Sequence, residues 1–248
     1  MNYTNKVFSF FINLHGNASI KFSTETKELL DYWKSSWSKY GWEPIIMSEE
    51  DIINHEYYHK LKFNNFYESN LCKLTVDFDC EYTRCCYMRW LAFHVACQKY
   101  GTICWADNDV INYGLSPEES RNLGINKVFA PEFCAGTMNY TGSKYILDSF
   151  IDVELGKHDI KNISPEEHSG VISDMFVLSD LVNWRGKEPH NRLCWITENK
   201  QWLKSKLVHY DNGIFSRPEY KEVLNRDGKK MSRLEAIKTL EEIREKDG

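Results

Sequence analysis

The sequence predicts an α/β fold in which helices flank a mixed, mainly parallel central sheet. Apolar segments of strand length alternate with amphipathic segments of helix length, the pattern of β-α-β units. At Gly101 a helical pattern ends and a segment of strand formers begins at once. The chain of 248 residues has 42% hydrophobic and 27% charged residues, a size and composition typical of one globular domain. We therefore expect a single domain over residues 1–248.

The beginning of the chain contains the first strand, helix and second strand. Residues 7–14 are apolar and aromatic and precede a loop signal, which predicts a strand. Residues 24–40 place their apolar side chains on one face, which predicts a helix that Gly41 ends. Residues 44–47 predict a second strand, and residues 48–51, a serine followed by three acidic residues, favour the start of another helix.

The middle of the chain carries the pattern on which the functional prediction depends. Before Gly101 the apolar residues recur at helical spacing, and residues 102–106 (TICWA) predict a buried strand. Asp107 and Asp109 follow this strand, and an apolar pair comes directly after them. Open α/β sheets bind ligands at the carboxyl ends of their strands, and carboxylate oxygens suit Mg²⁺ or Mn²⁺. The sequence therefore predicts a metal site here.

A second D-x-D pair, Asp77 and Asp79, precedes the predicted helix. Acidic residues at this position stabilise a helix start, so we interpret this pair as helix capping. Metal binding by Asp77 and Asp79 is the alternative, and it would give a cluster of four aspartates together with Asp107 and Asp109.

The rest of the chain continues the alternation. Ser116 and Pro117 predict the start of a short helix, as a capping residue followed by a first-turn proline. Residues 71–76 are either a short strand or a lead into the next helix. Strands are predicted at 127–130, at 133–140, where several residues are small, and at 192–197. Helices are predicted at 143–155, after 164–167 and at 229–245.

Residues 89–114 resemble the D-x-D region of nucleotide-sugar glycosyltransferases with the GT-A fold, including small virus-encoded sugar transferases. The shared pattern is a helix start with an arginine and an aromatic residue, then a glycine, an apolar strand and D-x-D. The chain has a single Gly101 where many relatives carry two glycines, and Asn108 lies between the aspartates. The resemblance implies a Rossmann-like GT-A domain, with the nucleotide-sugar half at about 1–114 and the acceptor half at about 115–248.

The resemblance also implies a reaction and a set of site residues. The activity would be metal-dependent transfer of a hexose or pentose from a UDP- or GDP-sugar to a hydroxyl of a carbohydrate acceptor, with Mn²⁺ or Mg²⁺ as cofactor. A late histidine completes the metal site in several such families. The implied metal ligands are Asp107, Asp109 and His209, the implied donor-binding residues are Phe10, Asn13, Arg89, Asp107 and Gly136, and the implied catalytic residue is Asp174.

Two other functions stay open from the sequence. The four aspartates described above could serve a metal-dependent phosphodiesterase or nuclease. A catalytically inactive carbohydrate-binding protein on the same fold is the other alternative. The net charge of −5 argues against nucleic acid as a partner, because no basic excess neutralises phosphates.

The eight cysteines show no metal-binding spacing, and most lie in apolar segments. We therefore expect reduced thiols and a cytoplasmic location, in the host cytoplasm if the protein is virus-encoded. No segment reaches the length of a membrane-spanning helix.

Overall fold

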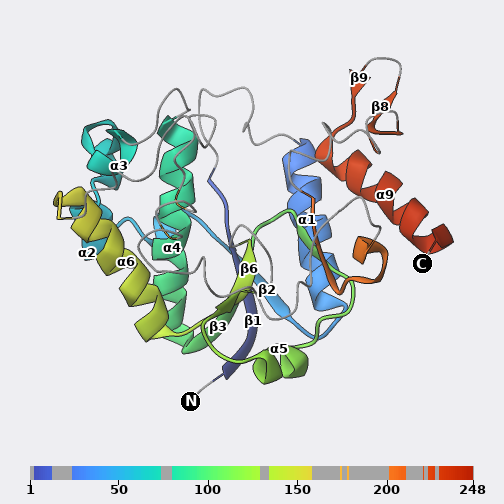
Figure 1. Ribbon diagram of the computed structural model, residues 1–248, viewed down its shortest axis with the longest axis horizontal. Helices are drawn as coiled ribbons and strands as arrows, with labels where there is room; N and C mark the ends of the chain where they lie inside the picture. The colour runs from blue at the N-terminus through green and yellow to red at the C-terminus, as the bar shows by residue number, and fades with distance from the viewer. Residues whose placement is uncertain are drawn as a thin grey trace.

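The computed structural model describes residues 3–12, 24–73, 80–128, 134–157, 174, 178, 201–210, 220, 223–226 and 229–247. Within these ranges a central sheet lies between two layers of helices (Figure 1). The predicted α/β class with a mixed sheet is therefore confirmed.

The central sheet has five strands in the order β2-β1-β3-β6-β5. β1 pairs in parallel with β2 and with β3, whereas β6 pairs antiparallel with β3 and with β5. The sheet is thus parallel in its first three strands and antiparallel beyond β3. The strands are β1 (Tyr3–Phe10), β2 (Glu43–Met47), β3 (Thr102–Ala106), β5 (Lys127–Val128) and β6 (Ala135–Met138).

The helices divide between the two faces of the sheet. In Figure 1, α4 and α6 lie on one side with α2 and α3, and α1 and α9 lie on the other. The helices are α1 (Thr24–Ser38), α2 (Glu56–Lys60), α3 (Asn70–Lys73), α4 (Cys80–Tyr100), α5 (Pro117–Leu123), α6 (Tyr140–Glu154) and α9 (Arg233–Asp247). Short 3₁₀ turns cover Glu49–Asp51, Phe63–Glu68 and Gln201–Lys204.

The alternation of side chains along the inner strands produces two hydrophobic cores. In β3, Trp105 points into the core shared with α4 and α6, and Cys104 points into the core shared with α1 and α9. In β1, Phe8 and Val7 divide in the same way. Because all five residues of β3 are buried, its sequence reads as a continuous apolar segment rather than an alternating one.

Most predicted elements in the described ranges are present. The second strand and the strand before Asp107 are confirmed, and Ser116 caps α5 through a reciprocal pair of bonds with Glu119. β1 starts earlier than predicted, because Tyr3 pairs with Thr102 of β3. Residues 70–73 form α3, so the described part of the lead-in predicted at 71–76 is helical, and residues 74–76 lie outside the described residues. The elements predicted at 192–197 and after 164–167 lie outside the described residues.

Two additional ribbons lie outside the central sheet. β4 (Val110–Asn112) pairs antiparallel with β7 (Leu207–His209), and β8 (Asn225–Arg226) pairs antiparallel with β9 (Lys229–Lys230). The first ribbon joins the segment after Asp109 to a segment almost one hundred residues later. It is the contact that assembles the candidate site.

The prediction that all cysteines are reduced is wrong for one pair. Cys72 at the end of α3 and Cys80 at the start of α4 form a disulfide, with their Cα atoms 6.2 Å apart. No disulfide joins the other five cysteines of the described residues. The pairing depends on how α3 and α4 pack, which no spacing pattern reports. The bond gives no support to the predicted cytoplasmic location, because stable disulfides are uncommon in reducing compartments.

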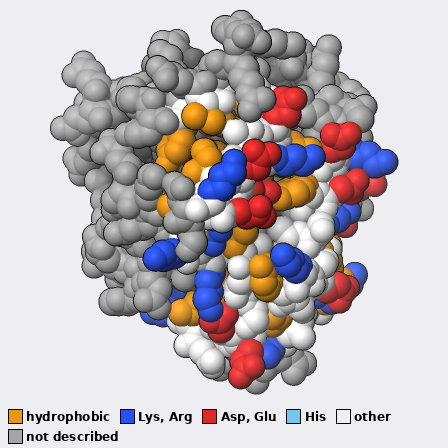
Figure 2. Space-filling view, turned by 90° about the vertical axis from the view of Figure 1, so that its right-hand side faces the viewer, with side chains coloured by type: hydrophobic (Ala, Val, Ile, Leu, Met, Phe, Trp, Pro, Cys, Tyr) orange, Lys and Arg blue, Asp and Glu red, His pale blue; other side chains and the backbone are white. Residues whose placement is uncertain are grey.

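The outer surface beside α9 carries charges of both signs. Figure 2 shows acidic and basic side chains mixed with apolar ones on this face. None of the helices in the described ranges has the length and apolar character needed to cross a lipid bilayer.

Candidate metal centre

The buried strand β3 places the D-x-D turn at the edge of the sheet. All five residues of β3 are buried, and Asp107 is the first residue after the strand. The Asp107 backbone N–H donates to the Cys134 carbonyl at 2.7 Å, and the Val110 N–H donates to the Asp107 carbonyl at 3.0 Å. The turn is therefore held on both sides by backbone bonds, and its carboxylates lie at the carboxyl end of β3, as the sequence predicts.

The ribbon of β4 and β7 brings His209 to the same turn. Val110 is the partner of His209 in this ribbon, and the Tyr210 N–H donates to the Asp109 carbonyl at 2.9 Å. β4 itself is anchored from α1, because the Trp37 indole N–H donates to the Val110 carbonyl at 3.0 Å. The position of His209 is thus fixed by strand pairing and not by its own loop.

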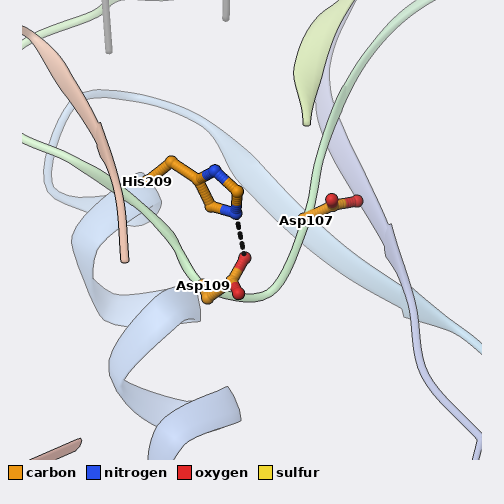
Figure 3. A group of neighbouring side chains, drawn as sticks. All are labelled: Asp107, Asp109 and His209. Atoms are coloured by element: carbon orange, nitrogen blue, oxygen red, sulfur yellow. Dashed lines mark ion pairs between the residues drawn. The ribbon is translucent and has the colours of Figure 1, made fainter. Parts of the chain in front are cut away.

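Asp107, Asp109 and His209 form a group that could hold a metal ion. One ligand atom from each residue lies within 4.8 Å of the others. His209 Nε2 is 3.3 Å from Asp109 Oδ1, and Figure 3 shows the ring facing this carboxylate. The Asp109 and His209 side chains are 11% and 10% exposed, and that of Asp107 is 24% exposed.

The donor set fits a divalent ion. Asp109 Oδ1 is buried and accepts no hydrogen bond from the described residues. Its contact with His209 Nε2, at 3.3 Å, is long for a hydrogen bond, and a cation held by both residues would satisfy this oxygen more fully. Two carboxylates suit Mn²⁺ or Mg²⁺, and the imidazole favours Mn²⁺ of these two.

Burial and neighbouring charges separate the pKa values of the two aspartates. Burial raises the pKa of Asp107 to about 6, although the Arg89 guanidinium opposes this shift. Burial acts in the same direction on Asp109, but His209 and Arg233 outweigh it and bring the pKa of Asp109 to about 2. Burial alone would lower the pKa of His209, but Cys134 and Asp109 raise it well above its usual value. Asp109 is therefore the anionic centre of the group.

Arg89 of α4 connects the centre to Asp174. Its Nη1 donates to both carboxylate oxygens of Asp107 at 2.9 and 2.8 Å, and its Nη2 donates to Asp174 Oδ2 at 2.8 Å. The Trp90 indole N–H also donates to Asp174 Oδ2, at 2.6 Å. The Asp174 side chain is only 1% exposed. The structure thus brings the predicted residues Arg89, Asp107 and Asp174 into one network.

One charged residue of the centre has no counterpart in the sequence prediction. Arg233, the first residue of α9, donates from Nη1 to Asp109 Oδ2 at 2.8 Å. In the sequence Arg233 belongs to a polar amphipathic helix and looks like any surface arginine. No local pattern could have identified it, because its partner lies 124 positions earlier.

The remaining predicted residues have separate positions. Phe10 ends β1 and packs partly buried against the core on the α4 side, at the same edge of the sheet as Asp107 because β1 and β3 are parallel. Gly136 of β6 is packed tightly: an added Cβ would lie 2.3 Å from the Lys127 carbonyl and 2.4 Å from the Trp105 ring. This close approach is sufficient to explain why the position is a glycine. Contact between Gly136 and a ligand stays a prediction. Asn13, Asp77 and Asp79 lie outside the described residues.

Neither the protein-family models nor the curated proteins compared with this sequence match it.

Proposed function

We propose that the protein is a metal-dependent glycosyltransferase that moves a sugar from a nucleoside-diphosphate sugar to a hydroxyl group of a carbohydrate. The observation that carries the proposal is the Asp107, Asp109 and His209 group at the carboxyl edge of a mixed α/β sheet. The D-x-D pattern of residues 89–114 adds the resemblance to sugar transferases. Mn²⁺ or Mg²⁺ would be held by these three side chains.

The proposed reaction needs stabilisation of negative charge on a departing diphosphate, and a bound divalent ion supplies it as a Lewis acid. In the protein, Asp109 and His209 would hold the ion, and Arg89 would set the direction of the Asp107 carboxylate through its bonds to both oxygens. The fixed strand pairing of β4 and β7 keeps these ligands in place before any substrate binds.

Asp174 is proposed to act through Arg89. The sequence prediction is that this carboxylate stabilises charge on the sugar or takes the acceptor proton, but its side chain is buried and accepts hydrogen bonds from Arg89 and Trp90. A carboxylate with this environment is suited to hold a guanidinium in position. We therefore assign Asp174 a positioning role, in which it orients Arg89 toward Asp107.

Asp109→Asn tests the metal centre. We expect at least a ~100-fold loss of transfer and of Mn²⁺-dependent nucleotide binding, the scale for removal of one key electrostatic group. Calorimetry with Mn²⁺ and UDP or GDP measures binding, and donor consumption with carbohydrate acceptors measures transfer. Asp152→Asn is the matched control, because Asp152 pairs with Lys157 on the surface of α6 and should leave both values unchanged.

The same measurements separate the alternatives. Full transfer in the presence of EDTA would contradict the proposal. Hydrolysis of a simple phosphodiester without affinity for any nucleotide sugar would favour the phosphodiesterase, and sugar binding without metal or turnover would favour an inactive carbohydrate-binding protein.

A further inference from the structure

Arg233 and His209 face opposite oxygens of the same carboxylate. Arg233 Nη1 lies 2.8 Å from Asp109 Oδ2, and His209 Nε2 lies 3.3 Å from Asp109 Oδ1. The Arg233 side chain is 24% exposed, so the ion pair is partly sheltered from water. In the structure, the most acidic residue of the candidate metal centre thus already has a cation beside it.

A divalent ion at this centre would compete with Arg233. The ion would need lone pairs of the Asp109 carboxylate that now accept the guanidinium. Two cations close to one sheltered carboxylate also repel each other, because the local dielectric is low. Loading of the ion therefore favours a conformation in which Arg233 has left Asp109.

The charges of the centre indicate what Arg233 would bind next. Asp107, Asp109 and Asp174 supply three negative charges and Arg89 and Arg233 supply two positive ones. An ion binds the neutral imidazole of His209, so the loaded centre carries −1 from these five side chains and +2 from the ion, a sum of +1. A sheltered group with excess positive charge favours an anionic ligand, and phosphate groups accept guanidinium bonds well.

The local structure allows the side chain to turn while α9 stays in place. Ser232 and Glu235 cap the start of α9 reciprocally: the Ser232 N–H donates to Glu235 Oε2 at 2.9 Å, and the Glu235 N–H donates to Ser232 Oγ at 3.1 Å. One face of the helix packs in the core through four buried side chains, those of Leu234, Ala236, Ile237 and Leu240. The helix thus holds its position without the bond between Arg233 and Asp109. Its N-terminal end also favours negative charge.

We propose that Arg233 exchanges partners when the metal ion binds. In the ion-free protein it neutralises Asp109; the divalent ion displaces it from this carboxylate, and it then binds the phosphate groups of the ligand that the ion holds. The inference rests on the proposed function for its metal and its diphosphate ligand, and it assigns Arg233 to the binding of that diphosphate.

The exchange predicts effects of opposite sign in Arg233→Gln. Calorimetry with Mn²⁺ alone should show binding tightened by about 3- to 10-fold, because the competing cation is gone. Calorimetry with inorganic pyrophosphate at saturating Mn²⁺ should show binding weakened by about 10-fold or more, the scale of one charge-assisted hydrogen bond. Arg233→Lys, which keeps the charge, should lie between Arg233→Gln and the unmodified protein in both titrations.

Arg244→Gln is the control for damage to α9. Arg244 lies on the same helix and donates to the carbonyls of Trp202 and Ser205, away from Asp109. If Arg233 only stabilised α9, Arg233→Gln would weaken the binding of both Mn²⁺ and pyrophosphate. Arg244→Gln shows how such a disturbance of α9 changes the two affinities. That result, or two unchanged titrations, would overturn the exchange.

The titrations distinguish this inference from the proposed function. If the unmodified protein binds neither Mn²⁺ nor Mg²⁺, the metal-dependent function is wrong and the exchange is wrong with it. If the unmodified protein binds Mn²⁺ and pyrophosphate but Arg233→Gln behaves identically, only the exchange is wrong. Opposite shifts in a protein that transfers no sugar would support the exchange and reject glycosyl transfer.

Discussion

At the scale of single residues, the centre depends on one arginine that serves two carboxylates. Arg89 contacts Asp107 and Asp174, and these three side chains are 14%, 24% and 1% exposed. Removal of one partner from a sheltered ion pair leaves the other charge without compensation. Asp174 is the most buried of the three, so its charge should matter most for stability.

Asp174→Asn should lower the free energy of unfolding by about 3 kcal/mol, the scale for breaking a buried ion pair. The turnover number should fall as well, because Arg89 loses the partner that orients it. Urea unfolding measures the first effect and steady-state kinetics the second. Normal stability together with a large loss of turnover would mean that Asp174 contacts the substrate, as the sequence suggests.

At the scale of elements, α4 and α6 pack around a buried histidine. His94 of α4 is 1% exposed, and its Nδ1 lies 2.9 Å from the Ser143 hydroxyl of α6. Burial lowers the pKa of His94 to about 4, with His55 and Lys144 adding to the shift and Asp148 and Glu56 opposing it. The neutral imidazole is therefore the form that the folded protein favours.

This shift predicts how His94 contributes to stability at different pH values. Unfolded histidine binds its proton near pH 6.5, well above the folded pKa, so protonation favours the unfolded state as the pH falls. As the pH falls from about 7 to about 5, protonation of His94 in the unfolded state should lower the free energy of unfolding by about 2 kcal/mol. Urea unfolding of His94→Gln should lack this share of the pH dependence, and an unchanged slope would contradict the assignment.

The contact between β3 and β6 makes a second prediction at this scale. Gly136→Ala should destabilise the protein by about 1 to 3 kcal/mol, because the new methyl group would overlap the Trp105 ring and the Lys127 backbone. Gly114→Ala is the matched control, since its new methyl group would meet only Lys206 at an ordinary 3.6 Å. Thermal unfolding of both variants measures the difference, and equal effects would argue against the tight packing.

At the scale of the whole molecule, the disulfide joins the segment before α4 to the helix that carries Arg89. Thiol titration in denaturant should find two fewer thiols without reductant than after reduction. In Cys72→Ser the two titrations should agree. Equal counts in the unmodified protein would contradict the bond between Cys72 and Cys80.

The sequence by itself determined the local parts of this protein. Continuous apolar segments and Gly101 predicted α4, β3 and the turn with Asp107 and Asp109, because helix periodicity, chain breaks and strand propensity act over a few neighbouring residues. It also singled out His209 and Arg89, through the resemblance to sugar transferases.

Only the tertiary structure decided which of these residues meet. The pairing of β4 with β7 brings His209 to Asp109, and the packing of α9 brings Arg233 to the same carboxylate. The disulfide between Cys72 and Cys80 and the burial of Asp174 against Arg89 and Trp90 arise in the same way. These contacts join segments whose proximity depends on strand register and helix packing, and no pattern in a short stretch of sequence carries that information.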